Sequence, residues 1–245
     1  MAILTYHHIG KPPDDAHSHR GLWVAPEAFA GHLRWLSANG YAAVGLDAVA
    51  EALSGLRPLP RRWVCITFDD GWRDNFTRAL PALQAHGYTA TVFVVTGWIR
   101  TGPPADDDTD TLSADELRAM ASVGITIGSH TATHPRLTSL DDEAIRAELT
   151  ASRSALADIL GSPPRWLCYP YGNCSERVER IARESGYSGA VSTIRDNRVR
   201  PDQLFRLPRV MVMNDTTPAR LGYMLSWLYH AEHMIKNRRR WRGRA

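Results

Sequence analysis

The sequence predicts an α/β protein in which parallel strands alternate with helices. Short apolar runs of strand type alternate almost throughout with segments of helical periodicity, and this alternation is typical of the βαβ units that build parallel sheets. The chain has 245 residues, 44% of them hydrophobic, which suits one large domain with a sizeable core. The periodicity does not separate an open sheet from a closed barrel.

Strands are expected at short apolar runs that are rich in β-branched residues. The run TATVFVV is a clear example, because β-branched side chains pack well in a buried strand. The predicted strands cover residues 2–6, 42–44, 63–68, 89–95, 125–128, 165–169 and 187–192.

Helices are predicted where apolar residues recur at helical spacing between start and stop signals. Ser113 is followed three residues later by Glu116, which is the pattern of a capping box. Asp47 and Ser175 are further predicted caps. The predicted helices cover residues 25–41, 46–53, 78–87, 113–124, 141–161 and 175–186, and the stretch from Ser226 to Met234 also has helical character.

The rest of the chain predicts loops but no interdomain linker. The longest loops are expected at residues 10–21, 100–110 and 195–203. We therefore expect one domain over residues 1–235, followed by a basic tail over residues 236–245. The net charge of +3, with a pI of about 8.9, is too small to indicate a nucleic-acid partner. The tail is expected to be a solvated end, and a weak contact with an anionic membrane surface is the alternative.

The cysteines and the N-terminus bear on the compartment. Three cysteines, Cys65, Cys168 and Cys174, are too few, and odd in number, for a disulfide framework. The start MAILTYHHIG has no basic leader and only a short apolar run. No stretch approaches the roughly 18 apolar residues of a membrane span. We expect a reduced, cytoplasmic protein, and the sequence predicts no oligomeric state.

Two adjacent aspartates, Asp69 and Asp70, end the apolar run in VCITFDDGW. Neighbouring carboxylates repel each other, and a desolvated charge is costly unless it is paired, hydrogen-bonded or bound to a metal ion. One of the two could therefore bind a metal ion while the other accepts a proton from a nearby water molecule. The alternative is that either aspartate only caps the following turn.

Two histidines, His130 and His134, lie four residues apart in GSHTATHP. On one helical turn this spacing would place both imidazoles on one face, within reach of one ion. A structural role for either histidine is the alternative. Both this pair and the aspartate pair follow predicted strands, and the carboxyl ends of parallel strands form one active-site face. One aspartate with two histidines is typical of catalytic zinc or non-haem iron sites with open positions.

Together, TFDDG and SHTATHP resemble the first two motifs of the polysaccharide deacetylase family, carbohydrate esterase family 4. This resemblance implies a distorted (β/α) barrel. It implies that Asp70, His130 and His134 bind a divalent metal ion, most often Zn²⁺, with Co²⁺, Ni²⁺ or Mn²⁺ as alternatives. It also implies that Asp69 is the general base in the hydrolytic removal of an N-acetyl group, or sometimes an O-acetyl group, from a sugar.

The stretch CYPYG resembles the third motif of the family, R-x-P-[YW]-G, but Cys168 stands in the position of the arginine. By the resemblance, Pro170 and Tyr171 belong to the substrate site, and the backbone N–H of Tyr171 helps to hold the oxyanion. The arginine that orients the catalytic carboxylate in the family would have to come from FRLPRV, as Arg206 or Arg209. We assign this role to Arg206.

The general acid of the family is a histidine in a late motif, which LSWLYHAEHM matches poorly. The N-terminal AILTYHHIG instead resembles the start of the poly-N-acetylglucosamine de-N-acetylase branch, whose catalytic domain is circularly permuted. This resemblance implies His7 as the general acid, with His8 as its competitor. The alternative is that His7 is a packed residue at a strand end. Trp72 and Trp98 are candidates for the wall of the sugar site.

These residues predict a metal-dependent enzyme that removes acetyl groups, N-acetyl above all, from an amino sugar in a saccharide or glycan precursor. One alternative is an O-acetyl esterase or another amide hydrolase that uses the same site. A second alternative is a carbohydrate-binding protein that has lost turnover, which the missing third-motif arginine favours. The presence of both aspartates and both histidines argues against this second alternative.

Overall fold

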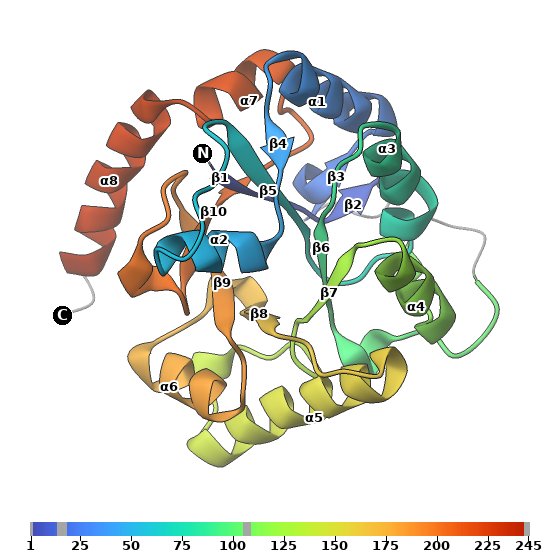
Figure 1. The fold of residues 1–245 in the computed structure, drawn as a ribbon. Coiled ribbons are helices and arrows are strands. Elements are labelled where there is room, and N and C mark those ends of the chain that lie inside the picture. Colours follow the sequence, from blue (N-terminus) through green and yellow to red (C-terminus); the bar gives the residue numbers. More distant parts are fainter. Residues whose placement is uncertain (1, 14–18, 105–108, 243–245) are drawn as a thin grey trace.

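A computed structural model of the chain describes residues 2–13, 19–104 and 109–242, and its centre is a closed barrel of parallel strands (Figure 1). Strand β1 pairs in parallel with β10 on one side and with β5 on the other, which closes the ring. The barrel strands are β1 (Ala2–Tyr6), β5 (Trp63–Phe68), β6 (Thr91–Val94), β7 (Thr126–Ser129), β8 (Trp166–Cys168), β9 (Gly189–Arg195) and β10 (Leu207–Met211). The expected (β/α) barrel is thereby confirmed.

Three short strands lie outside the ring. Strand β4 (Ala42–Ala43) pairs with β5, and β2 (His8–Ile9) pairs with β3 (Trp23–Val24) beside the barrel. A single residue, His7, separates β1 from β2.

The helices surround the barrel, and α8 lies along its outer side (Figure 1). Among the described residues, no helix is long and apolar enough to cross a membrane. The helices are α1 (Pro26–Ala38), α2 (Leu46–Leu53), α3 (Leu80–Ala85), α4 (Ala114–Ser122), α5 (Asp142–Leu160), α6 (Glu176–Glu184), α7 (Pro218–Met224) and α8 (Trp227–Arg242). A π-helical turn, Asn75–Ala79, leads into α3, and 3₁₀ turns cover Arg20–Leu22, Thr96–Trp98, Leu137–Ser139, Pro170–Gly172 and Pro201–Gln203.

Strand alternation divides the core into an inner and an outer layer. Successive side chains of a strand point to opposite faces, so Ile3 of β1 packs in one apolar cluster while Ala2 and Leu4 pack in another. The cluster of Ile3 contains Leu46 and Val49 of α2. The other cluster joins the opposite strand faces to helices such as α1.

All the predicted strands are confirmed, with ends shifted by at most a few residues. Strand β10 was not predicted, because Pro208 and Arg209 interrupt its apolar pattern. Strand β9 continues to Arg195, so it includes the first residue of the loop expected at 195–203. The loops expected at 10–21 and 100–110 lie partly outside the described residues.

The helix caps are confirmed with one exception. Ser113 and Glu116 form the predicted capping box, and the Ser175 side chain caps α6. The prediction for Asp47 is wrong, because α2 begins after Gly45. Asp47 lies inside the helix, where its carboxylate accepts a hydrogen bond from the Trp166 indole (2.9 Å).

Other predicted boundaries also move. The helix expected at 78–87 begins earlier, as the π-helical turn before α3. Residues 236–242, expected to be the start of a basic tail, continue α8. The last part of that expected tail, residues 243–245, lies outside the described residues.

Candidate active site

A pocket of about 1050 Å³ opens where several barrel strands end. This volume lies just above the range of roughly 300–1,000 Å³ that is typical of small-molecule sites. The residues that follow the carboxyl ends of β1, β5, β7 and β8 meet in it, as expected for parallel strands. Its lining includes His7, Asp69, Asp70, Trp72, Trp98, His130, His134 and Tyr171.

The backbone is strained around this pocket. Among the described residues, the non-glycine residues with positive φ are Asp70 (75°), Thr131 (70°), His134 (63°) and Tyr171 (58°). Such conformations cost of the order of 1–3 kcal/mol each, and they tend to cluster at functional sites. Of these residues, Asp70, His134 and Tyr171 line the pocket.

The two histidines of the second motif do not share a helical turn, and that expectation is wrong. The chain between His130 and His134 is an irregular loop after β7. The Thr131 hydroxyl accepts a hydrogen bond from the His134 N–H (3.0 Å). The Glu148 carboxylate accepts from two further backbone N–H groups of the loop, both at 2.9 Å. The loop, rather than helical spacing, brings the two imidazoles together.

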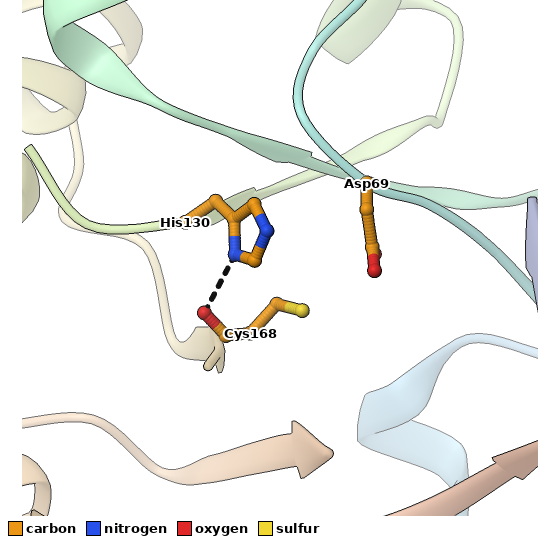
Figure 2. A group of neighbouring side chains, drawn as sticks. All are labelled: Asp69, His130 and Cys168. Carbon is orange, nitrogen blue, oxygen red and sulfur yellow. Dashed lines mark hydrogen bonds between the residues drawn. The ribbon is translucent and has the colours of Figure 1, made fainter. Parts of the chain in front are cut away.

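Asp70, His130 and His134 converge on one point. The Asp70 Oδ1 atom lies 3.4 Å from His130 Nε2 and 3.6 Å from His134 Nε2. The other ring nitrogen of His130, Nδ1, donates to the Cys168 carbonyl oxygen at 2.7 Å (Figure 2). This bond directs the Nε2 atom of His130 toward Asp70. The second oxygen of Asp70, Oδ2, accepts from the Trp72 indole at 3.1 Å.

This triad fits a divalent metal ion. Ligand atoms that lie 2.0–2.2 Å from a tetrahedral zinc ion are roughly 3.3–3.6 Å from one another, which matches the separations of the two histidine nitrogens from Asp70 Oδ1. Burial and the neighbouring His130 lower the pKa of His134 to about 4, so its lone pair is free at neutral pH. Burial opposes ionisation of Asp70, but the surrounding histidines outweigh it and lower the pKa of the carboxyl group.

A second group, Asp69, His130 and Cys168, also lies close together (Figure 2), but it does not suit a metal ion. The Arg209 guanidinium contacts both Asp69 and Cys168, with Nη2 at 2.7 Å from Asp69 Oδ2 and 3.2 Å from Cys168 Sγ. Burial also raises the pKa of the Cys168 thiol, and a protonated thiol is a poor metal ligand. The guanidinium already supplies the positive charge that this group needs.

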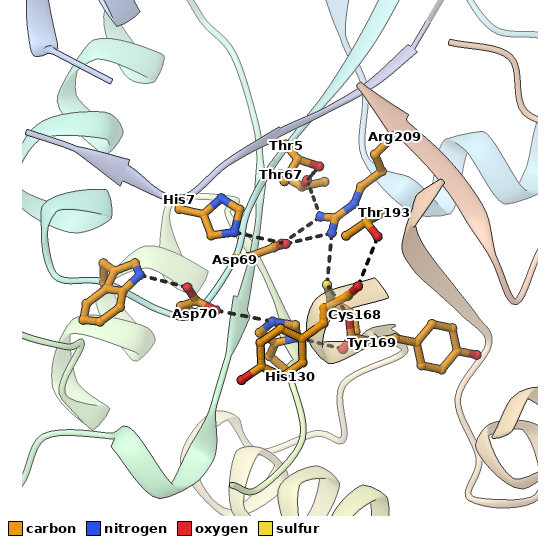
Figure 3. Close-up of polar contacts among 12 residues, drawn as sticks. Thr5, His7, Thr67, Asp69, Asp70, His130, Cys168, Tyr169, Thr193 and Arg209 are labelled. Carbon is orange, nitrogen blue, oxygen red and sulfur yellow. Dashed lines mark hydrogen bonds and ion pairs between the residues drawn. The ribbon is translucent and has the colours of Figure 1, made fainter. Parts of the chain in front are cut away.

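Arg209 holds Asp69 in a two-pronged ion pair (Figure 3). Its Nη1 and Nη2 atoms each lie 2.7 Å from one carboxylate oxygen of Asp69, and only 2% of Arg209 is exposed. Arg209 also donates to the Ser192 carbonyl (2.9 Å) and the Thr67 hydroxyl (3.0 Å). Burial opposes ionisation of Asp69, but Arg209 outweighs it and lowers the pKa of the carboxyl group. Asp69 is therefore ionised and fixed in orientation.

The assignment of an orienting role to Arg206 is wrong. The Arg206 Nη1 atom lies 3.4 Å from Glu179 on α6, whereas Arg209 binds Asp69. Strand periodicity contains the signal that separates the two arginines. Leu207 and Arg209 share one face of β10, and Leu207 belongs to the same apolar cluster as Ile3. The structure also places Cys168, at the position of the family arginine, against the guanidinium of Arg209.

His7 and His8 have different environments. His7 lines the pocket, its Nε2 lies 4.0 Å from Asp69 Oδ2, and its buried Nδ1 has no hydrogen-bond partner among the described residues. His8 bonds to Asp74 at 2.9 Å, and its ring stacks on Trp23 and Trp72. His8 lines the pocket as well, but its ring is held by Asp74 and the two tryptophans. His7, whose Nε2 atom faces Asp69, is therefore the better candidate to serve a substrate.

A tight turn after β8 presents Tyr171 to the pocket. The Tyr171 ring is 53% exposed and lies 4.7 Å from the His134 ring, between centroids. The preceding Pro170 is buried. The next residue, Gly172, has φ of 63°, and a Cβ atom there would lie 1.9 Å from the Thr193 hydroxyl. Only glycine fits at this position, so the turn is fixed by close packing as well as by backbone conformation.

Trp72 and Trp98 both line the pocket, as expected for a sugar-binding wall. Their rings are 6.1 Å apart, and the Trp98 ring lies 5.2 Å from that of His134. Trp166, in contrast, is a buried core residue. The two pocket tryptophans offer flat apolar faces next to the triad, which suit the apolar faces of a sugar ring.

Comparison with known proteins agrees with this geometry. Residues 57–190, more than half of the chain, match the family model described as polysaccharide deacetylase. A putative polysaccharide deacetylase of Bacillus subtilis, YxkH, is 29% identical over 86% of this chain and 71% of its own length. The poly-β-1,6-N-acetyl-D-glucosamine N-deacetylase of Escherichia coli is 35% identical over 43% of this chain, but the match spans only 15% of that longer protein.

A solved structure shows the same fold. The Streptococcus pyogenes deacetylase PplD, in complex with acetate, superposes with a TM-score of 0.83 at 25% sequence identity. The similarity covers 92% of this chain and 98% of that protein. It therefore extends well beyond residues 57–190, which match the family model.

Proposed function

Because the chain belongs to the polysaccharide deacetylase family, we propose that it is a metal-dependent hydrolase that removes acetyl groups, N-acetyl above all, from an amino sugar in a saccharide or glycan precursor. The observation that carries this proposal is the pairing of two carboxylates with separate environments. Asp70 faces two histidines at metal-ligand spacing, whereas both oxygens of Asp69 are bound by Arg209. One carboxylate is thus available as a ligand and the other as a base.

In this proposal Asp70, His130 and His134 hold a divalent ion, with zinc as the first candidate. When bound, the ion supplies a Lewis acid that polarises the acetyl carbonyl and makes a water molecule acidic at neutral pH. Asp69 accepts a proton from the attacking water, and Arg209 keeps that carboxylate ionised and aimed. The backbone N–H of Tyr171 is the proposed donor to the developing oxyanion.

His7 is the proposed general acid. Departure of an amine from the tetrahedral intermediate requires a proton, because an amine anion is a very poor leaving group at neutral pH. His7 lines the pocket, and its Nε2 atom lies 4.0 Å from Asp69 Oδ2, so a protonated Nε2 is placed to give that proton to the sugar nitrogen. The products are acetate and a free amino sugar.

The names of two similar proteins support acetyl as the group that is removed and N-acetylglucosamine as the sugar. The Escherichia coli relative is named for N-deacetylation of poly-β-1,6-N-acetyl-D-glucosamine, and the structure of PplD contains acetate, which is the product expected here. On these grounds N-acetylglucosamine units are the first substrates to test.

Acetate release from matched N-acetylated and O-acetylated saccharides tests the proposal. We expect zinc-loaded protein to release acetate from N-acetylchitooligosaccharides faster than from O-acetylated saccharides of the same length. Faster release from the O-acetyl series would change the assignment to an esterase. Release from neither series, by protein that retains one metal ion per chain, would contradict catalysis and favour a carbohydrate-binding protein.

The pH profile of kcat/KM tests His7. Burial lowers the pKa of His7, although Asp70 and Asp69 partly offset it. A general acid acts in its protonated form, so activity should fall as pH rises through a pKa below the usual value of about 6.5. His7→Gln should remove this alkaline limb and lower the rate by about 10²–10⁴-fold.

A leaving-group comparison and a neighbouring variant control this test. An aryl acetate needs no proton on its leaving group, so His7→Gln should impair its hydrolysis far less than that of an N-acetyl sugar. His8→Gln should keep the alkaline limb, because His8 is bonded to Asp74. An unchanged limb in His7→Gln would assign the general acid elsewhere.

A further inference from the structure

One part of the pocket wall has no role in the proposed chemistry. It is formed by the end of β9 and by one face of α8, through Thr193, Arg195, His233, Lys236 and Asn237. Thr193 and Arg195 both belong to β9 and both line the pocket, at a place where the register of β9 against β10 is irregular. We call this set the β9–α8 wall.

The β9–α8 wall begins next to the metal-binding triad. The Thr193 hydroxyl donates to the Tyr171 carbonyl oxygen at 3.2 Å, and the Tyr171 ring adjoins His134. Figure 3 shows Thr193 beside the catalytic group. Arg195 lies two residues farther along β9 and also lines the pocket.

The two elements of the wall are joined to each other. The Asn237 side chain of α8 donates to the Arg195 carbonyl oxygen at 3.1 Å. Lys236 is the residue before Asn237 on the helix. This hydrogen bond joins the two elements that carry Arg195 and Lys236, both of which line the pocket.

One of the two cationic side chains of the wall, Arg195, is not balanced by an ion pair with a described carboxylate. Arg195 is exposed, and no carboxylate among the described residues forms an ion pair with it. Lys236 pairs with Glu232, which does not line the pocket. Within the described lining, the carboxylates are Asp69 and Asp70, and the proposed mechanism commits both of them. An anionic ligand group would therefore find Arg195 without a competing carboxylate, whereas at Lys236 it would share the ammonium with Glu232.

We propose that the β9–α8 wall binds a phosphate group attached to the acetylated sugar, so that the substrate is a phosphorylated acetamido sugar rather than an uncharged polysaccharide. This inference rests on the proposed function, because it concerns the substrate of the same pocket. The planar fork of an arginine matches two phosphate oxygens, and a lysine adds a point charge. Two cations from separate elements suit a doubly charged phosphate better than a singly charged carboxylate.

Equilibrium binding tests the wall without turnover. Glucose and glucose 1-phosphate have no acetyl group, so zinc-loaded full-length protein cannot hydrolyse either of them by the proposed reaction. We expect glucose 1-phosphate to bind about tenfold more tightly at low ionic strength, as for hydrogen bonds to a charged group, and the difference to shrink as salt is added.

Variants then locate the phosphate. Arg195→Gln should remove most of the tenfold difference, and Lys236→Gln should remove part of it. Arg198→Gln is the matched control, because Arg198 is exposed, lies three residues farther on and does not line the pocket; it should keep the difference. Equal affinity of the wild-type protein for the two sugars would overturn the inference. So would an undiminished difference in Arg195→Gln, because the phosphate would then bind elsewhere, such as at the metal ion.

Kinetics separate this inference from the proposed function and identify the source of the phosphate. Acetate release is compared for N-acetylglucosamine, its free 1-phosphate, and the same sugar phosphate on a lipid carrier in detergent. A higher kcat/KM for a phosphorylated form supports phosphate binding at the β9–α8 wall. The form that reacts faster shows whether the phosphate belongs to a free or to a lipid-linked sugar. Faster release from the uncharged sugar overturns the inference. Release from none of the three compounds contradicts the proposed function, and the binding experiment then still shows whether the β9–α8 wall binds phosphate.

Discussion

Replacing Asp69 by asparagine is expected to lower acetate release by about 10²–10⁴-fold, the usual contribution of a general base, while one metal ion per chain is retained. The carboxylate is held by Arg209 and lies outside the proposed triad of metal ligands. Asparagine has nearly the same shape and keeps one oxygen that can accept a hydrogen bond from Arg209. It cannot, however, accept a proton from water.

The measurement is acetate release, together with the metal content and denaturant unfolding of the same preparation. Asp70→Asn is the matched comparison, because it should weaken metal binding as well as activity. If Asp69→Asn keeps near-full activity with its metal ion in place, Asp69 is not the base. If it loses the metal ion, the roles of the two aspartates have been assigned in the wrong order.

Replacing Arg209 by methionine is expected to destabilise the protein by about 3–5 kcal/mol, because removing one partner of a buried ion pair leaves the other charge unpaired. Both partners are nearly inaccessible to solvent. Activity should also fall, since the pKa of Asp69 would no longer be held down by the guanidinium. Urea unfolding measures the first effect and acetate release the second.

Two further variants separate stability from orientation. Arg206→Met is the control, because the Arg206 pair with Glu179 is partly exposed and such pairs contribute only about 0–1 kcal/mol. In the double variant Asp69→Asn/Arg209→Met, no buried charge is left without its partner, so part of the lost stability should return while activity stays low. A loss below 1 kcal/mol in Arg209→Met would contradict the buried pair.

The local elements were predictable where the sequence carries a strong local pattern. Strand β5 and the two aspartates after it follow from an apolar run that ends in charge, and the capping box at Ser113 follows from its spacing to Glu116. Asp47 was misjudged as a cap because a polar residue near a helix start resembles a cap in sequence. Only the structure shows that its carboxylate serves Trp166, which is distant in the chain.

The features that were missed depend on contacts between distant segments. Ring closure rests on the pairing of β1 with β5, which no local periodicity encodes. The sequence predicts that His130 and His134 converge, but it predicts a helical turn between them. The structure has a loop there, held by hydrogen bonds to Thr131 and Glu148. Arg209 was passed over for Arg206 because its strand was not recognised. The inward face of β10 becomes evident only once its neighbours are known.

The proposed deacetylation requires one metal ion bound by Asp70, His130 and His134. Zinc is titrated into chelator-stripped protein while acetate release from an N-acetylchitooligosaccharide is followed, for the wild type and for His130→Ala. We predict that wild-type activity rises from near zero and levels off at one equivalent of zinc per chain, whereas His130→Ala stays inactive at that ratio. Full activity of the stripped protein, or equal activation of His130→Ala, would contradict the account.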